Sequence, residues 1–314
     1  MGMVRPVTRV ESLPAGMGAA TTLRRPVVAR VTVSAVTGCA RSTWGLRRTP
    51  RALPTATAVI PGVLGLLKER AFLAASRIAR PPSNLESGMN KFTPMIDVVP
   101  QGSCGNARIE HYEVTAADSM FTSIRSIQHP DAYVPPGKYC RLRVNGGLMM
   151  SDTRMERITN FELLRNAHGH VFIAGLGIGM VLVPLVMRDD ITTITVVEKN
   201  PNVIQLVAPH FTVTSPWWVQ SGEAYKLHKL TVYEGDCFTW DPEAAMGSRP
   251  TFNTIYFDIW PDKSVGNLDD LTVLKRRYRK YMTRRPQPKT WMRGWVEDEL
   301  RAVKRRDKLR RMMW

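Results

Sequence analysis

Glycines and an acidic residue of this chain have the spacing of a nucleoside-binding site. The segment HVFIAGLGIGM, residues 170–180, places Gly175, Gly177 and Gly179 after an apolar run. Backbone without a Cβ can approach a ligand closely at such a turn, and a helix that begins there offers unpaired N–H groups. Glu198 ends the segment ITTITVVE about 20 residues later, where its carboxylate can accept hydrogen bonds from ribose hydroxyls. This spacing predicts a nucleoside cofactor at the turn.

Two more acidic residues follow predicted strands. Residues 230–233 form one predicted strand, and Asp236 comes shortly after it. Residues 253–257 form another, and Asp258 follows directly. The carboxyl ends of parallel strands meet at the ligand-binding edge of a sheet. We therefore expect both acids to converge with Glu198 and the glycine turn on one site.

Each of these residues alone also has an ordinary structural explanation. A single glycine is more often just part of a turn, Glu198 can cap a helix, and Asp236 can form a turn. The apolar run at residues 171–187 is also near the lower length limit for a membrane span. Glycines and Pro184 interrupt that run, and charged residues follow before the next strand. A buried strand, a turn and a helix is therefore the favoured interpretation, with no membrane partner.

Strands that alternate with helices predict an α/β fold, a mostly parallel sheet with helices on both faces. A strand at residues 108–114 and a hairpin at 139–150, with Asn145 and Gly146 in its turn, predict a small β-hairpin unit before it. The predicted helices cover residues 116–127, 153–167, 200–208, 269–282 and 297–312, and a fifth parallel strand covers 290–296.

Two local details are predicted for these elements. Thr153 and Glu156 have the spacing of a capping box, in which the two side chains bond to each other's backbone N–H groups at the start of a helix. Further along that helix, Phe161, Leu164 and Ala167 would face the core. Residues 211–229 predict an irregular excursion over the cofactor cleft.

The positive charge of the chain is concentrated at its two ends. Residues 1–88 carry 13 basic against 3 acidic residues, residues 89–274 carry 15 against 20, and residues 275–314 carry 16 against 4. The first segment fits a disordered basic arm, an organelle-targeting presequence or translation upstream of the true start. The change of character at Met89 favours a misread start. We expect three parts: the segment 1–88, a small β-rich unit at 89–150, and the main domain with its basic tail at 151–314.

The cysteines and histidines predict no metal centre. Cys39, Cys104, Cys140 and Cys237 are far apart and lack metal-ligand or redox spacing, which favours a reduced compartment. His168 and His170 have no third ligand at suitable spacing. We expect a cytoplasmic protein, with organelle targeting by residues 1–88 as the open alternative.

The order of these motifs resembles the class I S-adenosylmethionine-dependent methyltransferases, in their spermidine-synthase-like branch, over about residues 139–296. The resemblance implies a Rossmann-like domain in which VFIAGLGIG, with Leu176 between its glycines, would cradle the methionine part of S-adenosylmethionine. Glu198, followed by Lys199, would hold the ribose hydroxyls, and GDCF, with Asp236 and Cys237, would meet the adenine. The segment YFDIWPD would border the methyl acceptor. Uncharacterised methyltransferase-like proteins of bacteriophages look similar across SDTRMERITN, AGLGIGM and FDIWPD.

The chain departs from the family pattern in two places. Aminopropyltransferases carry a glutamine after the hairpin turn and an Asp-Glu pair on the next helix, whereas this chain has Met149 and the run Arg154, Met155 and Glu156. A polyamine needs several carboxylates to replace its hydration, and Arg154 would repel it, so methyl transfer is favoured over aminopropyl transfer. The closing antiparallel hairpin of the family is also missing. Without this hairpin, the strand at that end of the parallel sheet would have an open edge. The last helix, or a second copy of the chain in a homodimer, would cover this edge.

The expected chemistry is transfer of a methyl group to an N or O acceptor. Methyl transfer from a sulfonium needs alignment of donor and acceptor, and a base where the acceptor loses a proton. Asp258 is the catalytic candidate to orient or deprotonate the acceptor, and Trp260 is the candidate to stack on a planar acceptor. The acceptor itself, a small molecule or a nucleic acid, is left open.

The basic tail, residues 275–314, predicts contact with nucleic acid. Its cations could neutralise phosphates, and Trp291, Trp295 and Trp314 could stack on unpaired bases, although a solvated helix face explains the charge equally well. Two rival functions remain. An NAD-binding oxidoreductase is disfavoured because the turn lacks the later glycine of GxGxxG. A non-catalytic cofactor-binding module that holds RNA or DNA through the tail is the other.

Overall fold

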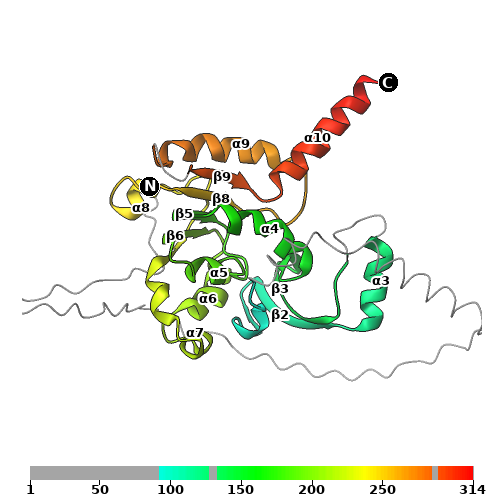
Figure 1. Ribbon diagram of the computed structural model, residues 1–314, viewed down its shortest axis with the longest axis horizontal. Helices are drawn as coiled ribbons and strands as arrows, with labels where there is room; N and C mark the ends of the chain where they lie inside the picture. Colours follow the sequence, from blue (N-terminus) through cyan, green and yellow to red (C-terminus); the bar gives the residue numbers. More distant parts are fainter. Residues whose placement is uncertain (1–91, 127–132, 285–288, 314) are drawn as a thin grey trace, which may run out of the picture. The chain divides into compact units, whose positions relative to one another are not determined.

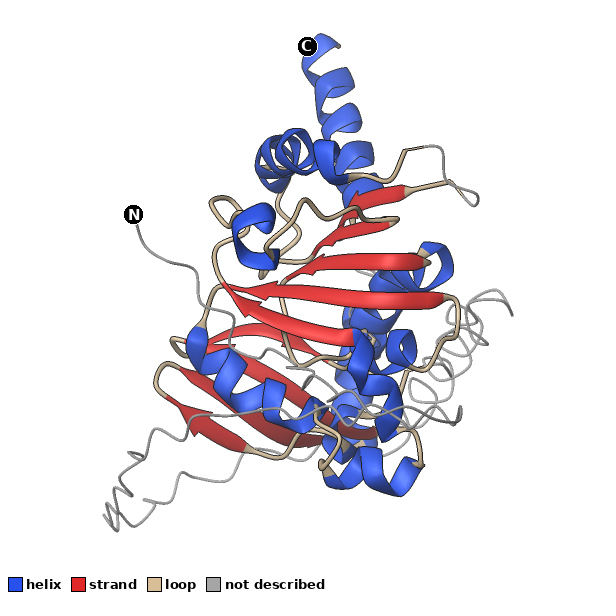
Figure 2. Ribbon diagram, turned by 90° about the vertical axis from the view of Figure 1, so that its left-hand side faces the viewer, coloured by secondary structure: helices blue, strands red, loops and turns tan. Residues whose placement is uncertain are grey.

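The computed structural model describes residues 92–126, 133–284 and 289–313. The predictions for residues 1–88, for Met89 and for Trp314 lie outside these residues. The described chain is an α/β structure with a five-stranded parallel sheet, flanked by helices, and a four-stranded antiparallel sheet (Figures 1 and 2). The predicted fold class is confirmed at this level.

The antiparallel sheet contains the predicted hairpin. Its strands are β1 (Gly102–Cys104), β2 (Ala107–Val114), β3 (Gly137–Val144) and β4 (Gly147–Ser151), in that order. Asn145 and Gly146 both have positive φ, 52° and 78°, as the tight turn between β3 and β4 requires. The sheet is larger than the hairpin, because β2 pairs with β3 and β1 pairs with β2. The helix α3 (Ala116–Ser126) follows β2.

The parallel sheet has the strand order β7-β6-β5-β8-β9, and every neighbouring pair is parallel. Its strands are β5 (Gly169–Ala174), β6 (Ile191–Glu198), β7 (Leu230–Glu234), β8 (Thr254–Phe257) and β9 (Trp291–Gly294). After β5 the chain adds β6 and β7 on one side and then β8 and β9 on the other. The order therefore reverses between β5 and β8, and ligands of open α/β sheets bind outside the carboxyl ends of the strands at such a point.

Each face of the parallel sheet has its own core. Alternate residues of β5 point to opposite faces, so Val171 and Ile173 belong to one hydrophobic cluster and Phe172 and Ala174 to the other. The helices α4 (Arg154–Asn166), α5 (Leu182–Val186) and α6 (Pro201–Val207) contribute to the first cluster. The second cluster contains residues of α9 (Asn267–Tyr278) and rings around Phe172, including Tyr278 at 4.7 Å between ring centroids.

The helix predicted after the glycine turn is present as the five residues of α5. Two other local predictions were wrong. Thr153 makes no side-chain cap bond, and its hydroxyl instead lies 3.0 Å from the hydroxyl of Ser151. The segment at residues 211–229 is largely helical, with α7 (Pro216–Ser221) and a 3-10 helix at Ala224–Lys229, and Trp218 within it is fully buried. Packing of this tryptophan against Phe211, 6.2 Å between ring centroids, holds the segment in the core rather than over a cleft.

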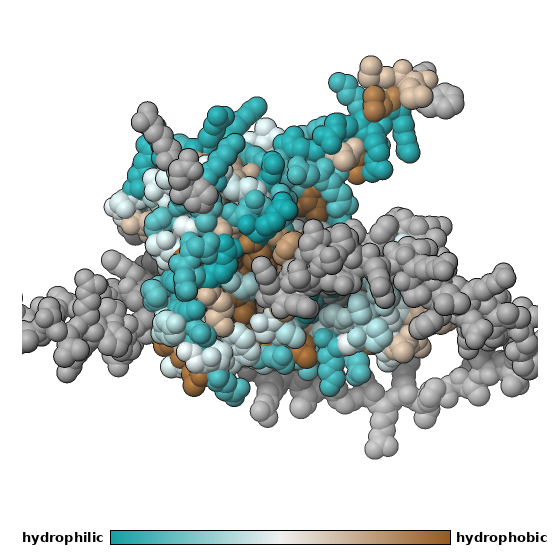
Figure 3. All heavy atoms as spheres, viewed as in Figure 1, coloured by the Kyte–Doolittle hydropathy of each residue, from teal (hydrophilic) through white to brown (hydrophobic). Residues whose placement is uncertain are grey.

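The last helix, α10 (Glu297–Met312), is fully buried only in its first turn, and Lys304 in the next turn pairs with Asp269 of α9 at 3.4 Å. Its buried residues are Glu297 and Leu300. The Glu297 carboxylate accepts hydrogen bonds from Lys275 at 2.6 Å and from the Gly294 N–H at 3.2 Å. Beyond this turn α10 extends away from the sheet, and its surface is hydrophilic up to apolar residues near its end (Figures 1 and 3). Among the described helices, none has the length and hydropathy needed to cross a membrane.

Candidate functional site

A cavity of about 640 Å³ lies at the carboxyl ends of the parallel strands. The antiparallel sheet contributes part of its wall through residues of β3 and β4. All but one of the residues predicted for the site line this cavity. They are Gly175, Leu176, Gly177, Glu198, Lys199, Asp236, Cys237, Asp258 and Trp260. The structure thus brings four separate strand ends together at the point where the strand order reverses.

The glycine loop is packed too closely to accept side chains at its first two glycines. Gly175 has φ of 99°, and a Cβ there would lie 2.0 Å from the carbonyl oxygen of Asp258. Gly177 has φ of 53°, and its Cβ would lie 2.0 Å from the sulfur of Met150. That sulfur also accepts a hydrogen bond, at 3.3 Å, from the N–H of Ile178. The loop is therefore held between the end of β8 and the hairpin, with its bare backbone along the cavity.

Gly179 does not line the cavity. It has φ of 76°, and a Cβ at this position would lie 2.4 Å from the ring of Phe211. The prediction that Gly179 contacts the cofactor is not supported by this geometry, because this glycine faces the packed segment after α6. The residues of α5 also lie outside the cavity lining. The glycine loop therefore meets the cavity with its own backbone and not with the N-terminus of α5, whereas Asn200 and Pro201, at the start of α6, do line the cavity.

Glu198 ties the glycine loop to the end of β6. Its Oε2 accepts a hydrogen bond from the N–H of Leu176, and its Oε1 accepts one from the N–H of Asn200, both at 2.8 Å. Burial raises the pKa of this carboxyl, although the backbone N–H groups oppose the shift. A carboxylate has about four acceptor positions, and the backbone N–H groups of Leu176, Asn200 and Lys199 face this one, so acceptor capacity remains for a ligand hydroxyl. Glu198 can thus hold the loop and bind a ligand hydroxyl at the same time.

Asp236 and Cys237 form the next part of the wall, after β7. Burial raises the pKa of Asp236, but the hydrogen bonds from Lys199 and from the Phe238 N–H more than offset this and leave it below its ordinary value. The Lys199 ammonium lies 2.8 Å from Oδ2. Burial raises the pKa of Cys237 to about 12, so this side chain is a neutral thiol at neutral pH. It offers a small, weakly polar surface and no thiolate nucleophile.

Asp258 and Trp260 lie where β8 ends. Burial raises the pKa of Asp258 to about 7, which places its proton exchange near neutral pH, as a general base requires. The indole N–H of Trp260 donates a hydrogen bond to Asp270 at 3.2 Å, which fixes the ring at the cavity. Both catalytic candidates predicted from the sequence therefore lie on the cavity wall. Asp258 has a pKa suited to proton transfer, and Trp260 presents a ring held by a hydrogen bond.

Glu156 is a cavity residue that the sequence reasoning assigned to another role. It lies on α4, is 6% exposed, and lines the cavity together with Asp258. Burial and the nearby charge of Asp258 raise its pKa to about 8. One turn further along α4, Asn160 is fully buried and accepts a hydrogen bond from Tyr256 at 3.1 Å. Two polar residues on the buried face of α4 were the available signal, because such a face otherwise holds apolar residues.

The structure gives Trp295 and Arg154 positions that differ from those predicted. Trp295 is only 4% exposed and lines the cavity, where its N–H bonds to Thr159 at 3.0 Å, so it cannot serve as a surface platform for bases. Arg154, expected to repel a polyamine, is absent from the cavity lining, whereas Met149 and Met150 are part of it.

No protein-family model matches the chain, and no curated protein matches it either. Within the described ranges, no group of three or more His, Cys, Asp and Glu residues is arranged to hold a metal ion. Cys104, Cys140 and Cys237 are free thiols.

Proposed function

We propose that the chain is an S-adenosylmethionine-dependent methyltransferase with a Rossmann-like domain. The observation that carries the proposal is the convergence of Gly177, Glu198, Asp236 and Asp258 on one cavity at the carboxyl ends of the parallel strands. The residues fit the cofactor, since a glycine loop without room for Cβ atoms can lie along its amino-acid part. Glu198 has acceptor positions for the ribose, and the wall at Asp236 can meet the base.

The charge of the cavity supports a sulfonium cofactor over a dinucleotide. The lining has one lysine, Lys199, which pairs with Asp236, and four further acidic residues, which are Glu156, Glu198, Asp258 and Asp270. Glu156 is uncharged near neutral pH because its pKa is raised to about 8, so the remaining charge of the cavity comes from the other carboxyls. Such an environment stabilises a cation and disfavours the two phosphates of NAD. This argues against the oxidoreductase rival on physical grounds independent of the glycine spacing.

The protein groups divide the work of methyl transfer among them. When bound, S-adenosylmethionine would supply an electrophilic methyl group on its sulfonium. Trp260 would orient a planar acceptor, and the Asp258 carboxylate would take the proton that the acceptor N or O releases as its lone pair forms the new bond to carbon. Glu156, with its raised pKa, would stay protonated while Asp258 ionises, because two adjacent carboxylates repel each other. Asp258 is thus the base, and the protonated state of Glu156 allows Asp258 to ionise.

Calorimetry on the full chain with S-adenosylmethionine, S-adenosylhomocysteine and NAD tests the cofactor. We expect the first two to bind and NAD not to bind. Glu198→Ala should abolish binding, while Glu198→Gln, which keeps one oxygen for the loop N–H, should weaken it by about tenfold through the lost charge. Tight NAD binding, or unchanged affinity in Glu198→Ala, would overturn the assignment.

The alternative of aminopropyl transfer differs in its donor and in its product. An assay with decarboxylated S-adenosylmethionine and a diamine distinguishes it from methyl transfer. Formation of a longer polyamine, without methylated product on any acceptor, would replace the proposed reaction while keeping the cofactor site.

Nucleic-acid binding through the tail is the second candidate function. It is favoured by α10, in which basic residues from Arg301 to Arg311 lie beyond the single buried turn and are largely exposed. Such a helix can neutralise several phosphates. Because β9 and α9 belong to the core, the deletion that tests this begins at Lys304. Loss of RNA or DNA retention with unchanged S-adenosylmethionine affinity would support the role, and unchanged retention would exclude it.

A further inference from the structure

A second cavity, of about 570 Å³, lies near the amino ends of the parallel strands. Its wall includes the end of α4 before β5, the turn before β6, and strand β9. It shares no residue with the first cavity. Four of its residues are lysine or arginine, and one is acidic. They are Arg165, Arg188, Lys289, Arg293 and Asp190.

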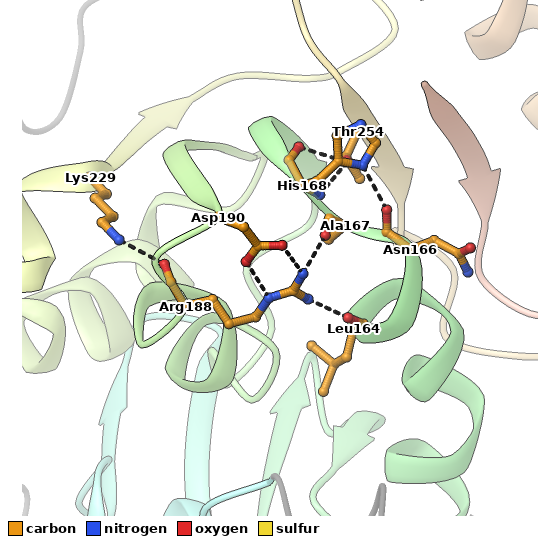
Figure 4. A network of polar contacts seen from close by, with 8 residues as sticks. All are labelled: Leu164, Asn166, Ala167, His168, Arg188, Asp190, Lys229 and Thr254. Carbon is orange, nitrogen blue, oxygen red and sulfur yellow. Dashed lines mark hydrogen bonds and ion pairs between the residues drawn. The ribbon is translucent and has the colours of Figure 1, made fainter. Parts of the chain in front are cut away.

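Arg188 is the structural member of this group (Figure 4). Its guanidinium donates hydrogen bonds to the carbonyl oxygens of Leu164 and Ala167, and thereby satisfies the free end of α4. The same guanidinium holds Asp190, with its Nε at 2.8 Å from Oδ1. Asp190, the only acidic residue among the described residues of the lining, is therefore neutralised by an arginine that is already in place.

The other cations have no such partners. Arg165, Lys289 and Arg293 form no ion pair within the described part of the chain. The Nε of Arg293 is buried and has no hydrogen-bond acceptor among these residues. A buried N–H without an acceptor destabilises the folded chain. This guanidinium is therefore in a position that a bound anion would stabilise.

His168 adds a second incomplete group. Its Nδ1 lies 3.0 Å from the carbonyl oxygen of Asn166, so this nitrogen must be the donor of that bond. Its Nε2 is buried and has no partner in the described residues. In this tautomer Nε2 is an acceptor, and it can receive a hydrogen bond from a hydroxyl of an organic phosphate.

Trp291 supplies an apolar wall. It lines the cavity and stacks on Tyr256 at 5.9 Å between ring centroids, with an interplanar angle of 19°. The cavity volume exceeds what a bare phosphate needs, and a ring beside cations suits a phosphate that carries an organic group.

We propose that this cavity binds a phosphate group attached to a nucleoside, with Arg165, Lys289 and Arg293 as its cationic ligands. The nucleoside phosphate is either a free nucleotide or part of a nucleic-acid strand. The proposal does not rest on the methyltransferase assignment, because the two cavities have separate linings.

The test is calorimetry of the full chain with uridine 5′-monophosphate, uridine, inorganic phosphate and a short single-stranded RNA. We expect the nucleotide to bind and uridine not to bind. Arg293→Met should weaken nucleotide affinity by about tenfold or more, since charge-assisted bonds are lost. Arg165→Met, at an exposed position where folding is not at risk, should weaken it in the same direction. Tighter binding of RNA than of the nucleotide, weakened by Arg293→Met but not by Arg305→Met, would identify the strand as the source of the phosphate.

Two controls separate this site from its alternatives. Arg305→Met removes the same charge from the exposed part of α10 and should leave nucleotide affinity unchanged. Glu198→Ala alters the first cavity and should also leave it unchanged. Absence of nucleotide and RNA binding, or equal losses in Arg293→Met and Arg305→Met, would overturn the proposal.

Discussion

The two ends of the parallel sheet differ in charge although the same strands build both. At the carboxyl ends, five acidic residues and one lysine line a cavity closed by a glycine loop. At the amino ends, four basic residues and one acidic residue line the other. In the first, buried carboxyls have raised pKa values, and in the second an arginine satisfies the helix end and neutralises the one carboxylate. One sheet thus presents a site suited to a cation and a site suited to an anion.

The two cavities also differ in whether their charged groups can exchange protons. The carboxyl-end cavity holds groups that can exchange protons near neutral pH, Asp258 and Glu156. The amino-end cavity has permanently charged guanidiniums, which can bind but cannot act as bases. We therefore expect changes at the first cavity to affect turnover and changes at the second to affect binding or stability alone.

The largest expected effect comes from Asp258. Asp258→Asn should lower methyl transfer by about 10³-fold, because the base is lost, while S-adenosylmethionine affinity stays within a few fold. Single-turnover kinetics with a methyl acceptor, once one is found, and calorimetry give the two values. Turnover at the level of the unmodified protein would remove Asp258 from catalysis and break the contrast between the two ends.

Gly175→Ala should have the next largest effect. The added Cβ would meet the Asp258 carbonyl oxygen at 2.0 Å, so the loop must move and S-adenosylmethionine affinity should fall by about 10²-fold. Gly222→Ala is the matched control, since Gly222 has φ of 74° with no atom within 4 Å of the added Cβ. The control should cost only the left-handed backbone strain, about 1–2 kcal/mol, without loss of affinity. Equal affinity losses in both variants would show that backbone strain, and not the contact, is responsible.

Among the cations of the amino-end cavity, Arg188 has a structural role, whereas Arg165 is proposed to bind the ligand. Arg188→Met should lower the free energy of unfolding by about 2 kcal/mol, because the carbonyls of Leu164 and Ala167 lose a charged donor. Arg165→Met should leave it unchanged, since no ion pair of Arg165 exists among the described residues. Urea denaturation measures both. Equal stability of the two variants would contradict the distinction.

The smallest effect is expected in the pH dependence. Methyl transfer should rise with pH through about 7 as Asp258 loses its proton, and Glu156 should add a second inflection near 8. Glu156→Gln should remove the upper inflection and keep the lower one. Loss of activity across the whole pH range would instead make Glu156 the base.

Stability provides a separate check of the same pair. Burial raises both pKa values above their ordinary 3.8 and 4.5, so the folded chain binds more protons than the unfolded chain between about pH 4 and 8. The free energy of unfolding should therefore contain a contribution that falls as pH rises through this window. Glu156→Gln should reduce that fall, and an unchanged slope would show that Glu156 is not buried as an acid.

The regular elements could be predicted because their signals are local. The β-branched run of β6, the Asn-Pro start of α6 and the Asn-Gly turn of the hairpin each determine their own conformation. The convergence of Glu198, Asp236 and Asp258 followed from one topological rule, that carboxyl ends of parallel strands share an edge. These predictions needed no knowledge of side-chain packing.

The parts that were missed depend on contacts between distant segments. Gly179 looks like its two neighbours in the sequence, but the ring of Phe211 beside it gives it a packing role. In the sequence, Glu156 has the spacing of a capping box with Thr153. In the structure the Thr153 hydroxyl lies beside that of Ser151, and the Glu156 carboxyl interacts with the charge of Asp258 instead. The amino-end cavity combines α4, the turn before β6 and β9, and no short motif marks such a combination.

The contact between Gly175 and the end of β8 has a consequence for how this site can change over time. The obstructing atom is a main-chain oxygen, which every amino acid possesses. A larger residue at position 175 therefore cannot be rescued by trimming a neighbouring side chain, as most crowded core positions can. At Gly177, by contrast, the obstructing atom belongs to the Met150 side chain, so a smaller residue at position 150 can make room there. Position 175 is thus the one of the two that stays glycine while β8 keeps its course.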